Sequence, residues 1–171
     1  MSKYYIGIMC GTSLDSIDVS IASITSTKMK VKSFNEYKLG KDLKRQINLA
    51  KKNNRPIKVL NKISVDITNL VCECIKDILS KNKLTHKDID ALGFPGITLN
   101  HRPDLKISTF IGDAALLAKK LKIRVRICTI DRQWMGSAYL ERAERGAIRI
   151  PTILARKIYS SWDASVNVRE C

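Results

Sequence analysis

Turn-forming residues, aromatic residues and long apolar runs are all scarce in this sequence. Its 171 residues include four prolines and eight glycines, and aromatic residues make up 6%, which argues against fibrous and low-complexity chains. No run of about 18 apolar residues is present, and the amino-terminal residues reach glycine and polar side chains before the apolar core of a signal peptide could form. We therefore expect one soluble domain without a membrane span, located in the cytoplasm.

The sequence is equally poor in metal-binding side chains. The cysteines are odd in number and scattered, and two of them stand one residue apart rather than in a CxxC pair. These features exclude a zinc set and a disulfide framework, so we expect buried or unreactive thiols. The residues concerned are Cys10, Cys72, Cys74, Cys128, Cys171, His86 and His101.

Acidic residues are outnumbered by basic ones. The chain has 16 Asp and Glu against 31 Lys and Arg, a formal net charge of +15. Such a surface attracts polyanions, whether nucleotides or nucleic acid. The basic residues are spread along the whole chain, and aromatic residues for base stacking are few. A basic nucleic-acid-binding domain is therefore kept as an alternative supported by the charge alone, and nucleic acid is not expected to be the main partner.

Apolar periodicity predicts the order of the first secondary-structure elements. Residues 4–10, 17–24 and 29–38 read as strands of an amino-terminal antiparallel meander, because they are apolar or alternate between apolar and polar. A short basic helix capped by Asp42 is expected to follow. Apolar residues that recur every three or four positions predict a long helix over residues 60–81.

Strands and a helix are predicted to alternate in the next part of the chain. Strands are expected at residues 89–93, 107–112 and 123–130, loop and extended chain between the first two, and a helix capped by Asp113 before the third. These crossovers beside a hairpin meander predict an α/β fold with a mixed sheet. The pattern then fades, and residues 131–171 are expected to form a poorly packed tail.

The most distinctive motif lies in the turn between the first two strands, which reads Gly11-Thr12-Ser13-Leu14-Asp15-Ser16-Ile17-Asp18. A glycine followed by two hydroxyl residues can present backbone N–H and side-chain O–H donors to one anion, as phosphate-binding nests do. Asp15 or Asp18 could then orient Mg²⁺ through water, because this ion prefers oxygen ligands. No Gly-Lys-Ser/Thr follows, so the motif is not a Walker loop. The alternative is a solvated hairpin turn, which favours the same residue types.

Three segments resemble the anhydro-N-acetylmuramic acid kinase family. The opening YIGIMCGTSLDSIDVSI is similar to the family hairpin GxMSGTSLDGxD. The segment ALGFPGITLNHRP resembles xxGSHGQTxxHRP, and IGDAALLAKKLKIRV resembles IGDPALIAExxGIPV. The three motifs occur in the family's order with family-like spacing, from residue 4 to about residue 127.

The resemblance implies an actin-like, ribonuclease-H-like sugar-kinase fold, with residues 1–130 as its amino-terminal lobe. It implies that ATP and Mg²⁺ are cofactors, and that the hairpin residues named above, Gly11 through Asp18, contact the nucleotide phosphates. Gly96, Thr98, His101 and Arg102 match the segment expected on the sugar side. The implied reaction couples hydrolytic opening of the 1,6-anhydro ring to phosphorylation of the sugar at its 6-position, in cell-wall peptidoglycan recycling.

The sequence also departs from the family pattern. Ser16 replaces a glycine, which would cost about 1 kcal/mol if that position needs a positive φ. Pro95 and Ile97 stand where the family has histidine and glutamine, so hydrogen-bonding groups expected near the sugar are missing. The family's later glycine-rich element is only faintly present in this sequence, and no residue matches the family's catalytic base. The second lobe is expected to be absent. A truncated, diverged family member without catalytic activity is therefore the main alternative.

Overall fold

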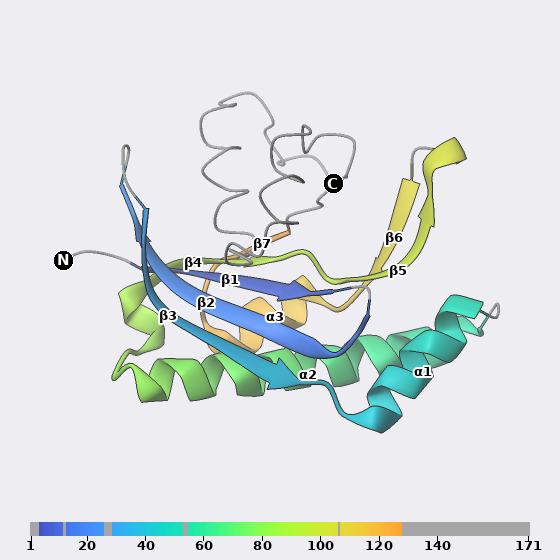
Figure 1. The fold of residues 1–171 in the computed structure, drawn as a ribbon, viewed down its shortest axis with the longest axis horizontal. Helices are drawn as coiled ribbons and strands as arrows, with labels where there is room; N and C mark the ends of the chain where they lie inside the picture. Colours follow the sequence, from blue (N-terminus) through green and yellow to red (C-terminus); the bar gives the residue numbers. More distant parts are fainter. Residues whose placement is uncertain (1–3, 12, 26–28, 53–54, 106, 128–171) are drawn as a thin grey trace.

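The computed structural model describes residues 4–11, 13–25, 29–52, 55–105 and 107–127, which form a mixed sheet with helices (Figure 1). The strands of this sheet are arranged in the order β3-β2-β1-β4-β7. Neighbouring strands pair antiparallel between β1 and β2 and between β2 and β3, and parallel between β1 and β4 and between β4 and β7. The strands are β1 (Tyr4–Cys10), β2 (Ser16–Ile24), β3 (Met29–Lys38), β4 (Ile89–Phe94) and β7 (Val125–Ile127). The predicted α/β class and mixed sheet are confirmed.

The three helices of the described residues lie on one side of this sheet (Figure 1). They are α1 (Lys41–Lys52), α2 (Ile57–Lys81) and α3 (Ala114–Leu121). Helix α2 is the long helix that the apolar periodicity predicts, and it contacts β2, β3, α1 and α3. Two short 3₁₀ turns, His86–Asp88 and Pro103–Leu105, also lie in the described part of the chain.

The hydrophobic core lies between the sheet and α2. Alternate residues of β1 and β2 join it, and α2 contributes a stripe at helical spacing, as expected for an amphipathic helix. Each fully buried aliphatic side chain of this kind contributes about 1.5–3 kcal/mol. The central members are Ile6, Ile8, Ile17, Val19, Ile21, Ile63, Ile67, Val71, Ile75 and Ile78, each at most 1% exposed.

One element and several boundaries differ from the sequence prediction; β2 begins at Ser16, α2 at Ile57 and β7 at Val125. The segment expected to be loop and extended chain forms β5 (Ile97–Arg102), which pairs antiparallel with β6 (Ile107–Ile111) in a separate two-stranded sheet. Strand β6, the pairing partner of β5, follows a turn that contains a proline and shows only weak alternation. No local sequence pattern therefore marks β5 as a strand. Helix α1 begins at Lys41, which places Asp42 inside the first turn instead of before it.

The third resembling motif fastens α3 to α2. The backbone N–H of Gly112 donates to Ser64 Oγ over 3.1 Å, and Asp113 accepts a hydrogen bond from the Leu116 N–H at 2.8 Å, as the predicted cap of α3. Gly112 has a φ of +123°, and a Cβ added there would lie 2.7 Å from the Phe94 ring. The glycine is therefore required by both backbone conformation and packing.

Two of the three described cysteines are buried, as predicted. Cys72 and Cys74 are buried on α2, and burial raises the pKa of the Cys74 thiol to about 12. Among the described residues, no three metal-ligating side chains converge, and no helix is long and apolar enough to span a membrane. Cys128, Cys171 and the tail predicted over residues 131–171 lie outside the described residues.

Candidate functional site

The candidate site is where the chain leaves two adjacent parallel strands. Strands β1 and β4 run in the same direction, with Gly7 opposite Gly93, so their carboxyl ends meet at one edge of the sheet. The loop after β1 and the turn after β4 both start at this edge. In open α/β sheets this edge is where ligands bind. The fold therefore brings the first and second resembling motifs to the same end of the molecule.

The loop from residue 11 to residue 15 is anchored by Leu14. This side chain is fully buried, and the residue has a φ of +56°. Its backbone N–H donates to the Gly11 carbonyl over 3.0 Å, which closes a tight turn. The next residue's carbonyl accepts from the Leu39 N–H at 3.0 Å, so the loop is also tied to the segment between β3 and α1. The loop is thus a shaped turn held by a buried side chain.

Ser13 is exposed at the tip of this turn, where its hydroxyl can meet a ligand. Thr12, the other predicted hydroxyl donor, lies outside the described residues. Gly11 is half-buried and Ser13 is exposed. N–H and O–H donors such as these residues carry are what a phosphate requires.

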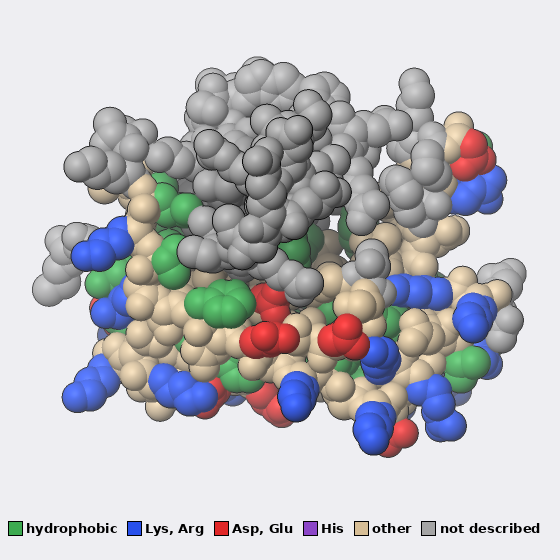
Figure 2. Space-filling model, viewed as in Figure 1, with side chains coloured by type: hydrophobic (Ala, Val, Ile, Leu, Met, Phe, Trp, Pro, Cys, Tyr) green, Lys and Arg blue, Asp and Glu red, His purple; other side chains and the backbone are tan. Residues whose placement is uncertain are grey.

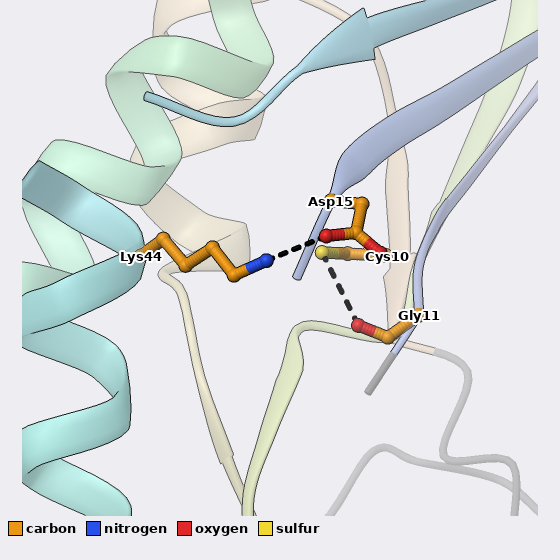
Figure 3. A network of polar contacts seen from close by, with 4 residues as sticks. All are labelled: Cys10, Gly11, Asp15 and Lys44. Carbon is orange, nitrogen blue, oxygen red and sulfur yellow. Dashed lines mark hydrogen bonds and ion pairs between the residues drawn. The ribbon is translucent and has the colours of Figure 1, made fainter. Parts of the chain in front are cut away.

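Asp15 points toward helix α1 (Figure 3). Its Oδ1 forms an ion pair with Lys44 Nζ at 2.5 Å, and the Asp15 side chain is 67% exposed. The carboxylate therefore lies at the surface of the site, held by a residue from another element. An exposed carboxylate at the phosphate loop fits water-mediated contact with Mg²⁺.

Asp18 occupies a different environment. It is 3% exposed on β2, and its Oδ1 accepts a hydrogen bond from Ser16 Oγ at 3.0 Å. Ser16 is buried at the start of the strand and is absent from the described residues that have a positive φ. The strain considered for serine at this position therefore does not arise. Ile17, between them, belongs to the core.

Cys10 ends β1 directly beside the loop. Its thiol donates to the Gly11 carbonyl over 3.7 Å (Figure 3). Burial, together with the Asp18 and Asp15 carboxylates, raises the pKa of this thiol to about 11 against the opposing effect of Lys51. The thiol is therefore protonated near neutral pH and is a poor nucleophile.

In the turn after β4, the two residues that depart from the family pattern are buried in the hydrophobic core. Pro95 is buried, and Ile97 is 2% exposed and belongs to the hydrophobic cluster. Gly96 between them has a φ of +72°, and a Cβ added there would lie 3.1 Å from the Ile111 carbonyl oxygen. The two residues that replace histidine and glutamine are thus packed inside the molecule, where they present no polar group to a ligand.

The remaining predicted sugar-side residues lie along β5. Thr98 is half-buried in this strand. Arg102 is exposed and forms a two-bond contact with Asp104, at 3.0 Å from Nε and 2.7 Å from a terminal nitrogen. This pairing holds the pKa of the Asp104 carboxyl below its usual value. His101 lies in the same strand, and its side chain is outside the described part of the chain.

Sequence reasoning missed two features of this site. The burial of Leu14 was hidden because the turn reads as uniformly polar apart from one leucine. The contact of Lys44 was hidden because it comes from a helix 29 residues further along the chain. The only local sign of this contact was that Lys44 and Lys51 stand two helical turns apart, on one face of a basic helix.

Comparison with known proteins agrees with the geometry. Residues 3–133 match the sequence profile described as anhydro-N-acetylmuramic acid kinase. A protein of that name from Hydrogenovibrio crunogenus is 33% identical over 123 residues, which cover 71% of this chain and 34% of the relative. One from Methylorubrum populi is 36% identical over 141 residues, covering 72% of this chain and 37% of the relative. One from Sulfurimonas denitrificans is 30% identical over 127 residues, covering 73% and 34%.

This chain spans roughly a third of the length of these relatives. The match covers every element that the structure describes, from β1 to β7. All three motifs fall inside it, including the loop after β1 and the turn after β4. The chain belongs to the anhydro-N-acetylmuramic acid kinase family.

Proposed function

We propose that this chain carries the phosphate-binding part of an ATP-dependent kinase that opens and phosphorylates 1,6-anhydro-N-acetylmuramic acid during peptidoglycan recycling in the cytoplasm. The observation that carries the proposal is the family match over residues 3–133. The strand order β3-β2-β1-β4-β7, with helices on one face, supports an actin-like, ribonuclease-H-like lobe formed by residues 1–130.

The loop after β1 is the proposed phosphate site. Backbone N–H groups around Gly11 and Ser13, with the Thr12 and Ser13 hydroxyls, would bind the nucleotide phosphates. Asp15 is the better placed of the two carboxylates to hold Mg²⁺ through water, since its side chain is exposed whereas that of Asp18 is buried. When bound, Mg²⁺ would neutralise charge on the phosphates during transfer.

The sugar would lie toward the turn after β4. Gly96, Thr98, His101 and Arg102 are the proposed contacts, since they match the family segment and follow the carboxyl end of β4. Arg102 would reach the sugar as a member of its pair with Asp104. Binding of this kind positions a substrate but does not activate water, and ring opening additionally needs a general base.

A family member without catalytic activity is the second candidate. Its support is the burial of Pro95 and Ile97, which places apolar side chains in the core at positions where the family pattern has hydrogen-bonding ones. A sugar site that lacks such partners loses affinity and rate by several kcal/mol. Nucleotide binding would survive this change, because the phosphate loop comes from a different strand.

Nucleic-acid binding is not proposed, because only the net charge of +15 supports it. Basic residues do gather on α1, where Lys41, Lys44, Arg45 and Lys52 line a pocket, but other Lys and Arg side chains on the face seen in Figure 2 are scattered away from that helix. A continuous basic track is what binding to a phosphate backbone requires.

Calorimetric titration with Mg-ATP, followed by a coupled assay of ADP release with 1,6-anhydro-N-acetylmuramic acid, tests the proposal. Binding with sugar-dependent ADP release supports the kinase. Binding without ADP release supports the inactive family member. Absence of Mg-ATP binding contradicts both, because each assigns the loop after β1 to phosphate.

A further inference from the structure

We propose that Lys44 of helix α1 is a positioning residue for the phosphate loop, which holds the Asp15 carboxylate in the place from which it can contact Mg²⁺ through water. The inference rests on the proposed function, because it concerns the same loop. It assigns a role to an element that lies outside all three resembling motifs.

The contact itself is specific. Lys44 Nζ lies 2.5 Å from Asp15 Oδ1, and the two side chains are 36% and 67% exposed. Figure 3 shows the lysine extending from α1 to the end of the loop. The adjoining backbone is fixed as well, because the Asp15 carbonyl accepts from the Leu39 N–H just before α1. Both the main chain and the side chain of Asp15 are therefore tied to the start of this helix.

A second lysine on the same helix supports this orientation of α1. Lys51 follows Lys44 by two helical turns, so the two lie on the same face. The charge of Lys51 partly offsets the raised pKa of Cys10, which ends β1 next to the loop. Both lysines of α1 therefore act on residues at the ends of the loop, Lys44 on Asp15 and Lys51 on Cys10.

The physical need for Lys44 follows from the chemistry of the ligand. A carboxylate that contacts Mg²⁺ through water contributes to binding only when its position is fixed. An unrestrained Asp side chain in a turn also competes for the backbone N–H groups of its own loop. The ion pair meets both needs, since it fixes the carboxylate of Asp15 and leaves the N–H groups of the loop to phosphate.

The test is a titration of Mg-ATP against five forms of the full chain: the unchanged protein, Lys44→Ala, Lys44→Arg, Asp15→Asn and the Lys44→Ala/Asp15→Asn double variant. Lys62→Ala is the matched control, because it removes another lysine that pairs with an aspartate, Asp66, at 2.7 Å within helix α2. All forms are compared at one ionic strength, with thermal unfolding used to establish that each is folded.

We expect Lys44→Ala to weaken Mg-ATP binding about tenfold, the scale of one unit charge near a solvated phosphate. Lys44→Arg should retain the affinity, because guanidinium also pairs with carboxylate. Lys62→Ala should leave it unchanged. In the Asp15→Asn background, Lys44→Ala should have no further effect, since Lys44 acts through Asp15.

Three results overturn the inference. Equal affinity of the unchanged protein and Lys44→Ala removes any role of Lys44. An equal loss from Lys44→Ala with and without Asp15→Asn shows that Lys44 acts directly on the phosphate or elsewhere. Failure of the unchanged protein to bind Mg-ATP overturns the proposed function together with the inference, whereas the first two results leave the proposed function intact.

Discussion

The hydroxyl of Thr68 on α2 accepts a hydrogen bond from the backbone N–H of Asp113 at 2.9 Å, and it donates to the Ser64 carbonyl at 2.8 Å. Thr68 is fully buried. One hydroxyl therefore joins the long helix to the residue that caps α3. The link gives the segment Ile-Gly-Asp at residues 111–113 a structural role that does not depend on the candidate ligand site.

Replacing Thr68 by valine should destabilise the fold. Valine preserves the volume of threonine but leaves the Asp113 N–H without its acceptor, at a cost of about 1–3 kcal/mol. Thr68→Ser keeps the hydroxyl and loses one methyl group, so it should cost about 1 kcal/mol. Urea unfolding of both variants measures the difference. A valine variant at least as stable as the serine variant would show that the hydrogen bond contributes no more than the methyl group does.

Gly112→Ala should be among the most damaging small substitutions in the described chain. An added Cβ would lie 2.7 Å and 2.9 Å from two atoms of the Phe94 ring, and the φ of +123° is strained for any side chain. We expect a loss of about 3 kcal/mol or more, from strain and overpacking together.

Gly40→Ala is the control for that substitution. Nothing lies within 4 Å of a Cβ added at Gly40, and no positive φ applies there. The free energy of unfolding should change by less than about 1 kcal/mol. Equal effects at Gly112 and Gly40 in urea titrations would mean that the contact with Phe94 relaxes without cost.

The pH dependence of stability should include a contribution from Asp77. Tyr37 Oη on β3 donates to Asp77 Oδ2 over 2.6 Å, and Lys81 pairs with the same oxygen at 2.7 Å. The hydrogen bonds from Lys81 and Tyr37 lower the pKa of the Asp77 carboxyl below its ordinary value of 3.8. The folded state therefore favours the ionised form, and this stabilisation is present above pH 3.8 and lost as pH falls through the lower folded value.

Asp77→Asn should accordingly flatten the acid limb of the stability curve. The stability difference between the unchanged protein and the variant should be larger near about pH 6 than near about pH 2.5. Urea unfolding at both pH values measures it, and Tyr37→Phe serves to separate the tyrosine hydrogen bond from the lysine pair. A difference that does not vary with pH would place the ionisation of Asp77 outside the folding equilibrium.

The sequence is a good guide to this fold where burial follows a local period. The alternation of Ile17, Val19 and Ile21 marks β2, and helical spacing marks α2, because each element packs one regular face on the core. Strand β5 escaped prediction because it depends on pairing with β6, a non-local interaction that leaves little trace in a single segment.

The candidate site was predictable in the same limited way. The loop after β1 could be located because glycine, hydroxyl and acidic residues cluster between two strands. Its contact with Lys44 could not, because that pair joins two elements whose relative placement depends on the packed core. The burial of Pro95 and Ile97 was equally hidden, since their neighbours come from the tertiary structure.

Leu14 and Asp15 are adjacent in the loop, and we expect their substitutions to have opposite consequences. Leu14 is fully buried, so Leu14→Ala should cost about 2–5 kcal/mol of stability through the cavity it leaves. Asp15 is exposed and its pair with Lys44 lies at the surface, so Asp15→Ala should change stability by less than about 1 kcal/mol.

Ligand affinity should follow the reverse order of these stability effects. Asp15→Ala should weaken Mg-ATP binding measurably in a fully folded protein, because it removes the carboxylate assigned to Mg²⁺. Thermal unfolding and calorimetric titration of the same samples separate the two properties. If Asp15→Ala instead unfolds the protein and leaves no change in affinity among the remaining folded molecules, the loop is a structural hairpin turn. A stable, weak-binding variant is what a phosphate loop built on a buried leucine requires.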